Sequence, residues 1–233
     1  MFRVFRGNNL LIWQIGLNDT SFLIPEKENL MPDKLPFTAL ILSGGKSSRM
    51  GRDKALLPFG GQTMLENIAK LTGRIFEETL IVVNDRLRIE GLDLRHVKVY
   101  EDLFKNKGPL AGIYTGLSYS KTQASCVFTC DMPFIDETLI RELADFWEEG
   151  VDALAFEDPE GNLQPFPGVY GRSARFLIRT LLHQGESSMR RFLGAARVKP
   201  FILKQEKISI LTNMNTIEDY YEILKLKEES AKE

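Results

Sequence analysis

The sequence predicts a three-layer α/β/α fold of the Rossmann-like kind, with helices on both faces of a mostly parallel central sheet. The first observation is a set of continuous apolar runs of strand length, at residues 37–42 (FTALIL), 79–83 (TLIVV) and 124–129 (ASCVFT). Such runs are typical of strands buried on both faces of a parallel sheet. The second is their alternation with segments of helical apolar spacing, the pattern of repeated βα units. With 233 residues and 43% hydrophobic content, the chain suits one domain of ordinary α/β size.

Helical segments separate the strands predicted in the first half of the chain. Residues 63–76 have apolar side chains at helical spacing. Residues 109–118 begin with proline, which favours the first turn of a helix. A short strand is expected at 97–100, and Asp136 can cap a helix that runs to about residue 149.

The second half repeats this alternation less regularly. Strands are expected at 152–156 and 166–170, joined across the turn-rich segment 158–162 (DPEGN). An amphipathic helix at 173–184 is expected to be closed by Gly185. The remaining elements are a strand at 198–203 and a last helix from Ile217 to about residue 227, for which Asn215 and Glu218 resemble a capping box.

Residues 1–36 stand apart from this pattern. Their only apolar run, residues 10–15, is too short for the apolar part of a secretory signal and far too short to span a bilayer. We interpret residues 1–36 as an N-terminal appendage, whose order and native origin the sequence leaves open, to a domain of residues 37–233. An extra strand at the domain edge and translation upstream of a natural start at Met31 are both compatible with this segment.

The overall charge and the few cysteines exclude several classes of protein. A net charge of −2 and a pI of about 5.9 predict neither a nucleic-acid partner nor a membrane surface. Cys126 and Cys130 are too few for a disulfide framework and poorly spaced for a zinc site. His96 and His183 lie far apart in the sequence, which weakens any histidine-based metal site or triad. These features favour a cytoplasmic protein.

The most informative segment is residues 42–54 (LSGGKSSRMGRDK), directly after the first predicted strand. Open α/β folds bind ligands at the carboxyl ends of their strands. Glycines let backbone N–H groups approach phosphate oxygens, and the segment's lysines and arginines supply charge. A Walker A loop is excluded, because Leu40 stands where its first glycine is required. The alternative, a surface turn with solvated charges, is disfavoured by so many glycines and cations directly after a buried strand.

Two further clusters carry chemistry. Residues 108–112 (GPLAG) place small residues at a helix start, where backbone donors could face a base or a phosphate. In residues 130–133 (CDMP), Asp131 is a carboxylate at the end of a predicted strand. Mg²⁺ takes one or two carboxylates and fills its shell with phosphate and water, so Asp131 is the candidate metal ligand. Cys130 is assigned to packing rather than to chemistry.

Together these motifs resemble the molybdenum cofactor guanylyltransferases, the molybdopterin-guanine dinucleotide biosynthesis protein A family of the nucleotidyltransferase superfamily. The resemblance runs from about residue 37 to residue 221. The paired Gly44 and Gly45, with GPLAG and the late NMNT, favour the guanylyl branch, since cytidylyl relatives more often have Ala-Ala-Gly at the first site. The motifs occur in the family's order: 42–54, VVN (82–84), ED (101–102), GPLAG (108–112), CDMP (130–133), QPFPGVY (164–170) and NMNT (213–216).

The resemblance implies a nucleotidyltransferase fold and a magnesium-dependent reaction. GMP would pass from GTP to the terminal phosphate of molybdenum-molybdopterin, giving the molybdopterin guanine dinucleotide cofactor and pyrophosphate. Proteins that handle the molybdenum cofactor, or acceptor molybdoenzymes, are the implied protein partners. Phosphoryl-type transfer asks the protein mainly for positioning and charge neutralisation, and the sequence offers no obvious Ser–His or Cys–His pair.

The resemblance also implies a role for each motif residue. Lys54, Arg49 and Asp131 would carry catalysis, with Asp131 as the magnesium ligand. Asn213 and Asn215 would face the pterin, and for Asn215 a helix cap is an equal alternative. The nucleotide would be bound by Leu42, Ser43, Gly44, Gly45, Lys54, Asn84, Asp102 and Asp131.

Three other functions are weighed against this one. The nearest is a cytidylyltransferase, or a nucleotidyltransferase with another phosphorylated acceptor. A non-catalytic adaptor that keeps the fold would be expected to lose Lys54 or Asp131, and the chain has both. A glycosyltransferase is disfavoured because no Asp-x-Asp motif follows a strand. The chain departs from the family pattern in its first 36 residues and at Ile217, where proline commonly follows the NMNT segment.

Overall fold

The computed structural model describes residues 3–7, 10–14, 21–25, 33–44, 53–203 and 214–230. The chain divides into two compact units, Met1–Asp33 and Lys34–Glu233. The first unit contains a three-stranded antiparallel sheet of β1 (Arg3–Gly7), β2 (Leu10–Gln14) and β3 (Ser21–Pro25). The interpretation of the first 36 residues as an appendage stays a prediction. No helix in the described ranges combines the length and the apolar character needed to cross a membrane.

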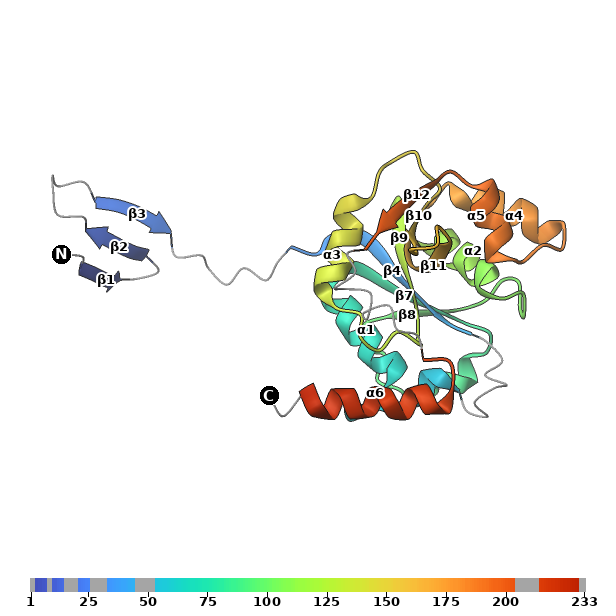
Figure 1. Cartoon of the computed structure of the whole chain (residues 1–233), viewed down its shortest axis with the longest axis horizontal. Coiled ribbons are helices and arrows are strands. Elements are labelled where there is room, and N and C mark those ends of the chain that lie inside the picture. The colour runs from blue at the N-terminus through green and yellow to red at the C-terminus, as the bar shows by residue number, and fades with distance from the viewer. Residues whose placement is uncertain are drawn as a thin grey trace. The chain divides into compact units, whose positions relative to one another are not determined.

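The second unit is built on a seven-stranded sheet in the order β12-β10-β11-β9-β4-β7-β8 (Figure 1). All neighbouring strands are parallel except β11, which is antiparallel to β10 and β9. A separate pair, β5 (Pro58–Phe59) and β6 (Gln62–Thr63), precedes the first helix. The strands of the large sheet are β4 (Leu35–Ser43), β7 (Phe76–Val83), β8 (Lys98–Glu101), β9 (Ala124–Thr129), β10 (Ala153–Glu157), β11 (Leu163–Gly171) and β12 (Val198–Ile202).

Helices cover both faces of this sheet. One buried cluster contains side chains of α1 (Met64–Ile75) and α3 (Glu137–Phe146). The other contains side chains of α2 (Pro109–Tyr119), α4 (Ala174–His183) and α5 (Met189–Ala195). Successive residues of β4 alternate between the two clusters, as expected for a strand buried on both faces. The predicted three-layer α/β/α fold with a mostly parallel sheet is therefore confirmed (Figure 1).

The last helix, α6 (Ile217–Ser230), packs outside these layers. Its Tyr220 and Ile223 belong to a third buried cluster with Leu57 and Phe59. The Tyr220 hydroxyl donates to the Pro58 carbonyl oxygen at 2.7 Å. These contacts attach the C-terminal helix to the segment that follows the Gly-rich loop.

The local structure departs from the sequence predictions at several points. α3 ends at Phe146 rather than near residue 149, because Trp147 already has an extended backbone. α5 was not predicted: it has only seven residues, and the Ser188 hydroxyl that caps it is its main sequence signal. Two short 3-10 helices, η1 (Lys54–Leu56) and η2 (Arg86–Ile89), were also not predicted.

The capping box of α6 lies one residue later than predicted. The Thr216 hydroxyl accepts from the Asp219 N–H at 3.1 Å, and Asp219 Oδ2 accepts from the Thr216 N–H at 2.8 Å. The same carboxylate accepts from the Asn215 N–H at 2.7 Å. The assignment of Asn215 and Glu218 is therefore wrong, because the four-residue spacing of a capping box occurs twice in NTIED and the second occurrence is used.

Helix α2 lies close to the sheet because two of its residues are glycines. A Cβ at Gly116 would lie 2.2 Å from Leu40 Cδ2, and a Cβ at Gly112 would lie 2.9 Å from Leu42 Cδ2. Leu40 is fully buried, so its side chain has little room to move away. The close approach sets how near α2 can lie to the end of β4.

We expect Gly116→Ala to lower the free energy of unfolding by about 1–3 kcal/mol, because the new methyl group overpacks the core. Gly73→Ala is the matched control, since no atom lies within 4 Å of a Cβ at this helical position. It should leave stability unchanged or raise it by up to about 1 kcal/mol, through better helix propensity. Urea unfolding of both variants measures the difference, and equal stabilities would contradict the close packing.

The sheet topology brings several chain segments to one edge. Parallel strands β4, β7, β8 and β9 all end at that edge, as does β10. Because β11 runs in the opposite direction, it begins there instead of ending there. The residues that follow β4, β7, β8, β9 and β10 therefore lie on the same side of the sheet as the first residues of β11.

Candidate active site

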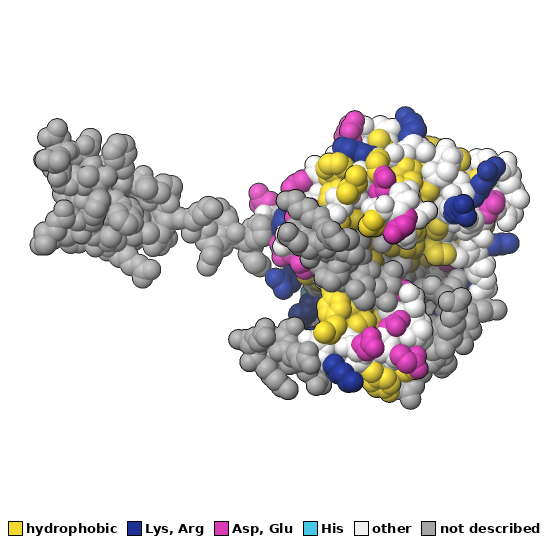
Figure 2. All heavy atoms as spheres, in the orientation of Figure 1, with side chains coloured by type: hydrophobic (Ala, Val, Ile, Leu, Met, Phe, Trp, Pro, Cys, Tyr) yellow, Lys and Arg dark blue, Asp and Glu magenta, His cyan; other side chains and the backbone are white. Residues whose placement is uncertain are grey.

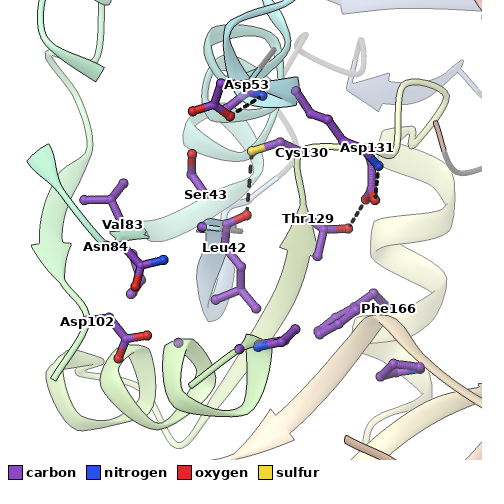
Figure 3. Close-up of a pocket in the computed structure, with 18 of the residues that line it drawn as sticks. Leu42, Ser43, Asp53, Val83, Asn84, Asp102, Thr129, Cys130, Asp131 and Phe166 are labelled. Carbon is purple, nitrogen blue, oxygen red and sulfur yellow. Dashed lines mark hydrogen bonds and ion pairs between the residues drawn. The ribbon is translucent and has the colours of Figure 1, made fainter. Parts of the chain in front are cut away.

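A cavity of about 660 Å³ lies at this edge of the sheet (Figure 3). Its wall includes seven of the residues assigned from the motifs: Leu42, Ser43, Gly44, Lys54, Asn84, Asp102 and Asp131. The segment 108–112 contributes Gly108, Pro109 and Gly112. Gly45, Arg49 and Asn213 lie outside the described residues, so their assignments stay predictions.

Lys54 is held at the cavity by the local structure around it. Asp53 Oδ1 accepts from the Ala55 N–H at 3.2 Å and so caps the short helix η1, of which Lys54 is the first residue. Asp53 Oδ2 pairs with Arg88 Nη2 at 2.5 Å. Arg88 belongs to η2, which follows β7, so this ion pair joins the segment after the Gly-rich loop to the segment that carries Asn84.

The Lys54 ammonium contacts two other motif residues. Its Nζ lies 3.5 Å from Asp131 Oδ2 and donates to Asn215 Oδ1 at 3.1 Å. The Lys54 and Asp131 side chains are 21% and 24% exposed, so solvent screens the pair and its contribution to stability is small. No motif in the sequence indicates the contact between Asn215 and Lys54. The side-chain cap proposed for Asn215 is replaced by this contact, and its assignment to the pterin side stays a prediction.

Asp131 follows the end of β9 and faces the cavity. The Thr129 hydroxyl donates to Asp131 Oδ1 at 2.5 Å, and the Asp131 backbone carbonyl accepts from the Met214 N–H at 2.9 Å. Within the described parts of the chain, no group of three or more His, Cys, Asp or Glu side chains could hold a metal ion. Asp131 is an oxygen donor of the kind that a hard cation takes when it uses one or two protein carboxylates and completes its shell with phosphate and water, and its assignment as a metal ligand stays a prediction.

Asn84 is oriented by its neighbours. The Asn106 N–H donates to Asn84 Oδ1 at 3.2 Å, and Asn106 has a positive φ of 62°. A Cβ at Gly44 would lie 3.0 Å from Asn84 Nδ2, so the absence of a side chain at Gly44 permits this approach. The Asn84 amide group consequently lies beside the end of β4 with its oxygen engaged, which leaves its NH₂ as the donor nearest Gly44.

Asp102 is the most buried carboxylate of the cavity wall, at 7% exposure. Its Oδ1 accepts from the Thr115 hydroxyl at 2.9 Å and from the Phe104 N–H at 3.0 Å. Burial raises the pKa of Asp102 above its ordinary value, and the two hydrogen bonds offset only part of this effect. The carboxyl is thus held between the end of β8 and helix α2.

The raised pKa of Asp102 gives a pH-dependent prediction. A carboxyl with a raised folded-state pKa favours folding most when protonated, so its contribution falls as the pH rises through that pKa. Asp102→Asn keeps an oxygen for both donors and removes the ionisation. We expect the variant to have the higher Tm at about pH 7, and this advantage to shrink as the pH falls through the raised pKa of Asp102 and to be lost by about pH 4, the ordinary pKa of an aspartate. Thermal unfolding of both proteins across this range tests it; an advantage that grows on acidification would contradict it.

Comparison with known proteins places this arrangement in a family. A family model described as "MobA-like NTP transferase domain" matches residues 39–200. The chain belongs to the MobA-like NTP transferase family. The resemblance stated from the motifs is thereby confirmed.

Individual relatives of this MobA-like chain agree with the family match. It is 32% identical over 195 residues to a Carboxydothermus hydrogenoformans protein named "Probable molybdenum cofactor guanylyltransferase", covering 81% of this chain and 95% of that protein. A Clostridium perfringens protein of the same name is 32% identical over 199 residues, covering 82% and 98%. The crystal structure of molybdopterin-guanine dinucleotide biosynthesis protein A from Archaeoglobus fulgidus superimposes with a TM-score of 0.72 at 22% identity, covering 83% and 100%, which shows the shared fold.

The cavity of this MobA-like chain also includes residues to which no motif assigns a role. Gln164, Pro165 and Phe166 come from the start of β11, and Asn106 comes from the turn after β8. The first three lie in the motif QPFPGVY, so the motif was recognised without a role for its residues. The signal that could have placed them is the hairpin turn at 158–162, because a hairpin makes β11 antiparallel to β10 and brings its start to the ligand edge.

Cys130, next to Asp131, is a neutral packing residue. Its thiol is buried and donates to the Leu42 carbonyl oxygen at 3.7 Å. Burial raises the pKa of Cys130 to about 12, so it remains protonated at neutral pH and is a poor nucleophile. The assignment of Cys130 to packing agrees with this geometry.

Proposed function

We propose that this protein transfers GMP from GTP to the terminal phosphate of molybdenum-molybdopterin. An oxygen of the acceptor phosphate forms a bond with the α-phosphorus of GTP, the bond from that phosphorus to the bridging β-phosphate oxygen breaks, and pyrophosphate leaves. The observation that carries the proposal is that Lys54 and Asp131 lie at one cavity with the end of β4, the strand that precedes the Gly-rich loop, in a MobA-like chain. The names of its relatives support the choice of guanine and of the acceptor.

The residues of the cavity divide between two tasks in this proposal. The ends of β4 and β7 bind the nucleotide, with the Asn84 amide as a hydrogen-bond donor and the backbone of Ser43 and Gly44 beside it. Asp102 and the first turn of α2 complete that side. Lys54 neutralises negative charge on the phosphates as the transition state forms, which is the main help that phosphoryl-type transfer requires from a protein.

Magnesium is the cation that we propose for Asp131. The cation would neutralise phosphate charge and hold the triphosphate in one geometry. Asp131 would be its protein ligand, and the Thr129 hydroxyl keeps the carboxylate oriented. Lys54 lies near the same carboxylate, so the lysine and the cation would act on the same triphosphate.

The setting that we propose is the cytoplasm, with GTP and molybdenum-molybdopterin as small-molecule partners. Both cysteines are buried, free thiols, which suits a reducing compartment. On the face drawn in Figure 2, basic and acidic side chains of the described residues are interspersed, without a large patch of one sign. Proteins that handle the cofactor, or acceptor molybdoenzymes, would deliver the substrate or take the product.

The test is pyrophosphate release with Mg²⁺, each of the four nucleoside triphosphates in turn, and molybdenum-loaded molybdopterin. We expect release with GTP and with none of the other three nucleotides, and we expect Asp131→Ala to abolish it. Preference for CTP would assign a cytidylyltransferase and leave the roles of the loop standing. If folded protein that still binds GTP releases no pyrophosphate with any nucleotide, the proposed acceptor is wrong. That result would favour another phosphorylated acceptor or a non-catalytic adaptor.

A further inference from the structure

The wall of the cavity opposite the nucleotide residues carries one aromatic side chain, Phe166. Phe166, at the start of β11, lines the cavity together with Pro165 and Gln164. In the sheet, β11 is separated from β7 and β8 by β9 and β4. Figure 3 accordingly shows Phe166 across the cavity from Asn84 and Asp102, with Leu42 and Thr129 between them. One cavity thus has a hydrogen-bonding end and an aromatic end.

The segment that carries this ring is fixed by its own contacts. Phe166 is partly buried and packs against the same apolar cluster as α2 and α4. The Tyr170 hydroxyl donates to the Pro165 carbonyl oxygen at 2.7 Å, and Gln164 Nε2 donates to Asp158 Oδ2 at 2.9 Å. A Cβ at Gly168 would lie 2.8 Å from the Pro165 and Leu154 carbonyl oxygens, so this strand has no room for a side chain there. The aromatic wall is therefore preorganised rather than a chance exposure.

The chemistry of the two ends suggests which substrate each takes. A base is distinguished from other bases by hydrogen bonds to its edge, and Asn84 and Asp102 provide such groups. Phe166 has no hydrogen-bonding group, so it recognises the face of a flat ring. In-line transfer places the attacking phosphate and the leaving pyrophosphate on opposite sides of the α-phosphorus. The acceptor therefore enters from a side that the triphosphate does not occupy. Asp131 follows β9, and the next strand on the side away from β4 and β7 is β11, which carries Phe166.

We propose that Phe166 is the stacking face of the acceptor subsite and takes a flat heteroaromatic ring of the pterin class. The inference rests on the proposed function, because the acceptor is named there. Pro165 extends the same wall, and the contacts of Gln164 and Tyr170 hold it in place. Phe166 is thus a binding residue for the acceptor and makes no contribution to the affinity for GTP.

The first experiment compares Phe166→Leu with wild type. Leucine keeps an apolar side chain and removes the aromatic face, so the KM for molybdenum-molybdopterin should rise about three- to tenfold. The Kd of GTP, measured without acceptor, should stay within about twofold, and Phe166→Tyr should restore the acceptor KM. Phe176→Leu is the matched control, since Phe176 is 62% exposed on α4 and does not line the cavity. Thermal unfolding verifies that each variant is folded.

A second measurement separates this inference from the proposed function. The binding of 6-hydroxymethylpterin, followed by its fluorescence in the presence of GTP and Mg²⁺, does not require turnover. Wild type should bind this pterin at least about threefold more tightly than Phe166→Leu, even if no GMP is transferred. An unchanged acceptor KM with equal pterin binding would overturn the inference. So would a loss of GTP affinity in Phe166→Leu, which would assign the ring to the nucleobase.

Discussion

Replacing Lys54 with alanine is expected to lower the rate of GMP transfer about 100-fold or more while the protein stays folded. Removing a cation that contacts developing phosphate charge typically costs about 2–4 kcal/mol of transition-state stabilisation, which corresponds to this loss. The fold should tolerate the change, because the contacts of Lys54 with Asp131 and Asn215 are partly exposed and add little stability.

The Lys54→Ala prediction is measured by single-turnover pyrophosphate release at saturating GTP, together with the Tm. Lys98→Ala is the matched control, since it removes an ion-paired lysine at the start of β8, at the end of the strand opposite to the cavity. The control should keep full activity. Near-normal turnover of Lys54→Ala would show that another cation, such as one in the Gly-rich loop, neutralises the phosphates instead.

Asp131→Asn is expected to lower activity by about two orders of magnitude and to raise the Mg²⁺ concentration needed for half-maximal rate. The amide keeps the shape of the side chain and an oxygen for the Thr129 hydroxyl, so the loss reports the charge that a hard cation requires. Metal neutralisation of phosphate charge contributes several kcal/mol, which gives this magnitude.

A magnesium titration of wild type and Asp131→Asn is the measurement. Asp145→Asn, on the exposed side of α3, is the control that should leave the titration unchanged. The same magnesium dependence in Asp131→Asn and wild type would exclude Asp131 as the ligand. Because Lys54 lies 3.5 Å from Asp131, the double variant Lys54→Ala and Asp131→Asn should lose less than the two single losses combined.

Local patterns predicted the part of the site that lies at the ends of parallel strands. The apolar run of β4 predicted a strand buried on both faces. It therefore also predicted that Leu42 and Ser43 lie at the end of that strand. The assignment of Asn84 and Asp102 came from the family resemblance. They lie at the same cavity as Asp131 because the strands before these three residues run in parallel. The chemistry of these residues was read from a family pattern, and the structure adds their contacts.

The remaining parts of the site depend on tertiary structure. Lys54 and Asn215 are 161 residues apart, and no local pattern indicates that their side chains meet. The strand of Phe166 was predicted, but its direction was not used, so its side chain was not placed at the cavity. The positive φ of Asn106 is set by the turn after β8. It could not be predicted from a glycine, because the residue at this position is asparagine. Gly45, Arg49 and Asn213 stay as predicted from sequence.

The antiparallel direction of β11 has a consequence for how this fold could diversify. The turn between β10 and β11 lies at the same ends of the strands as the cavity, close in sequence to Phe166. Local hydrogen bonds to Asp158 hold it. A surface turn tolerates insertions and deletions better than the strands that it joins. Relatives could therefore change the acceptor that they accept by altering the length of this turn, while the nucleotide half of the cavity stays constant.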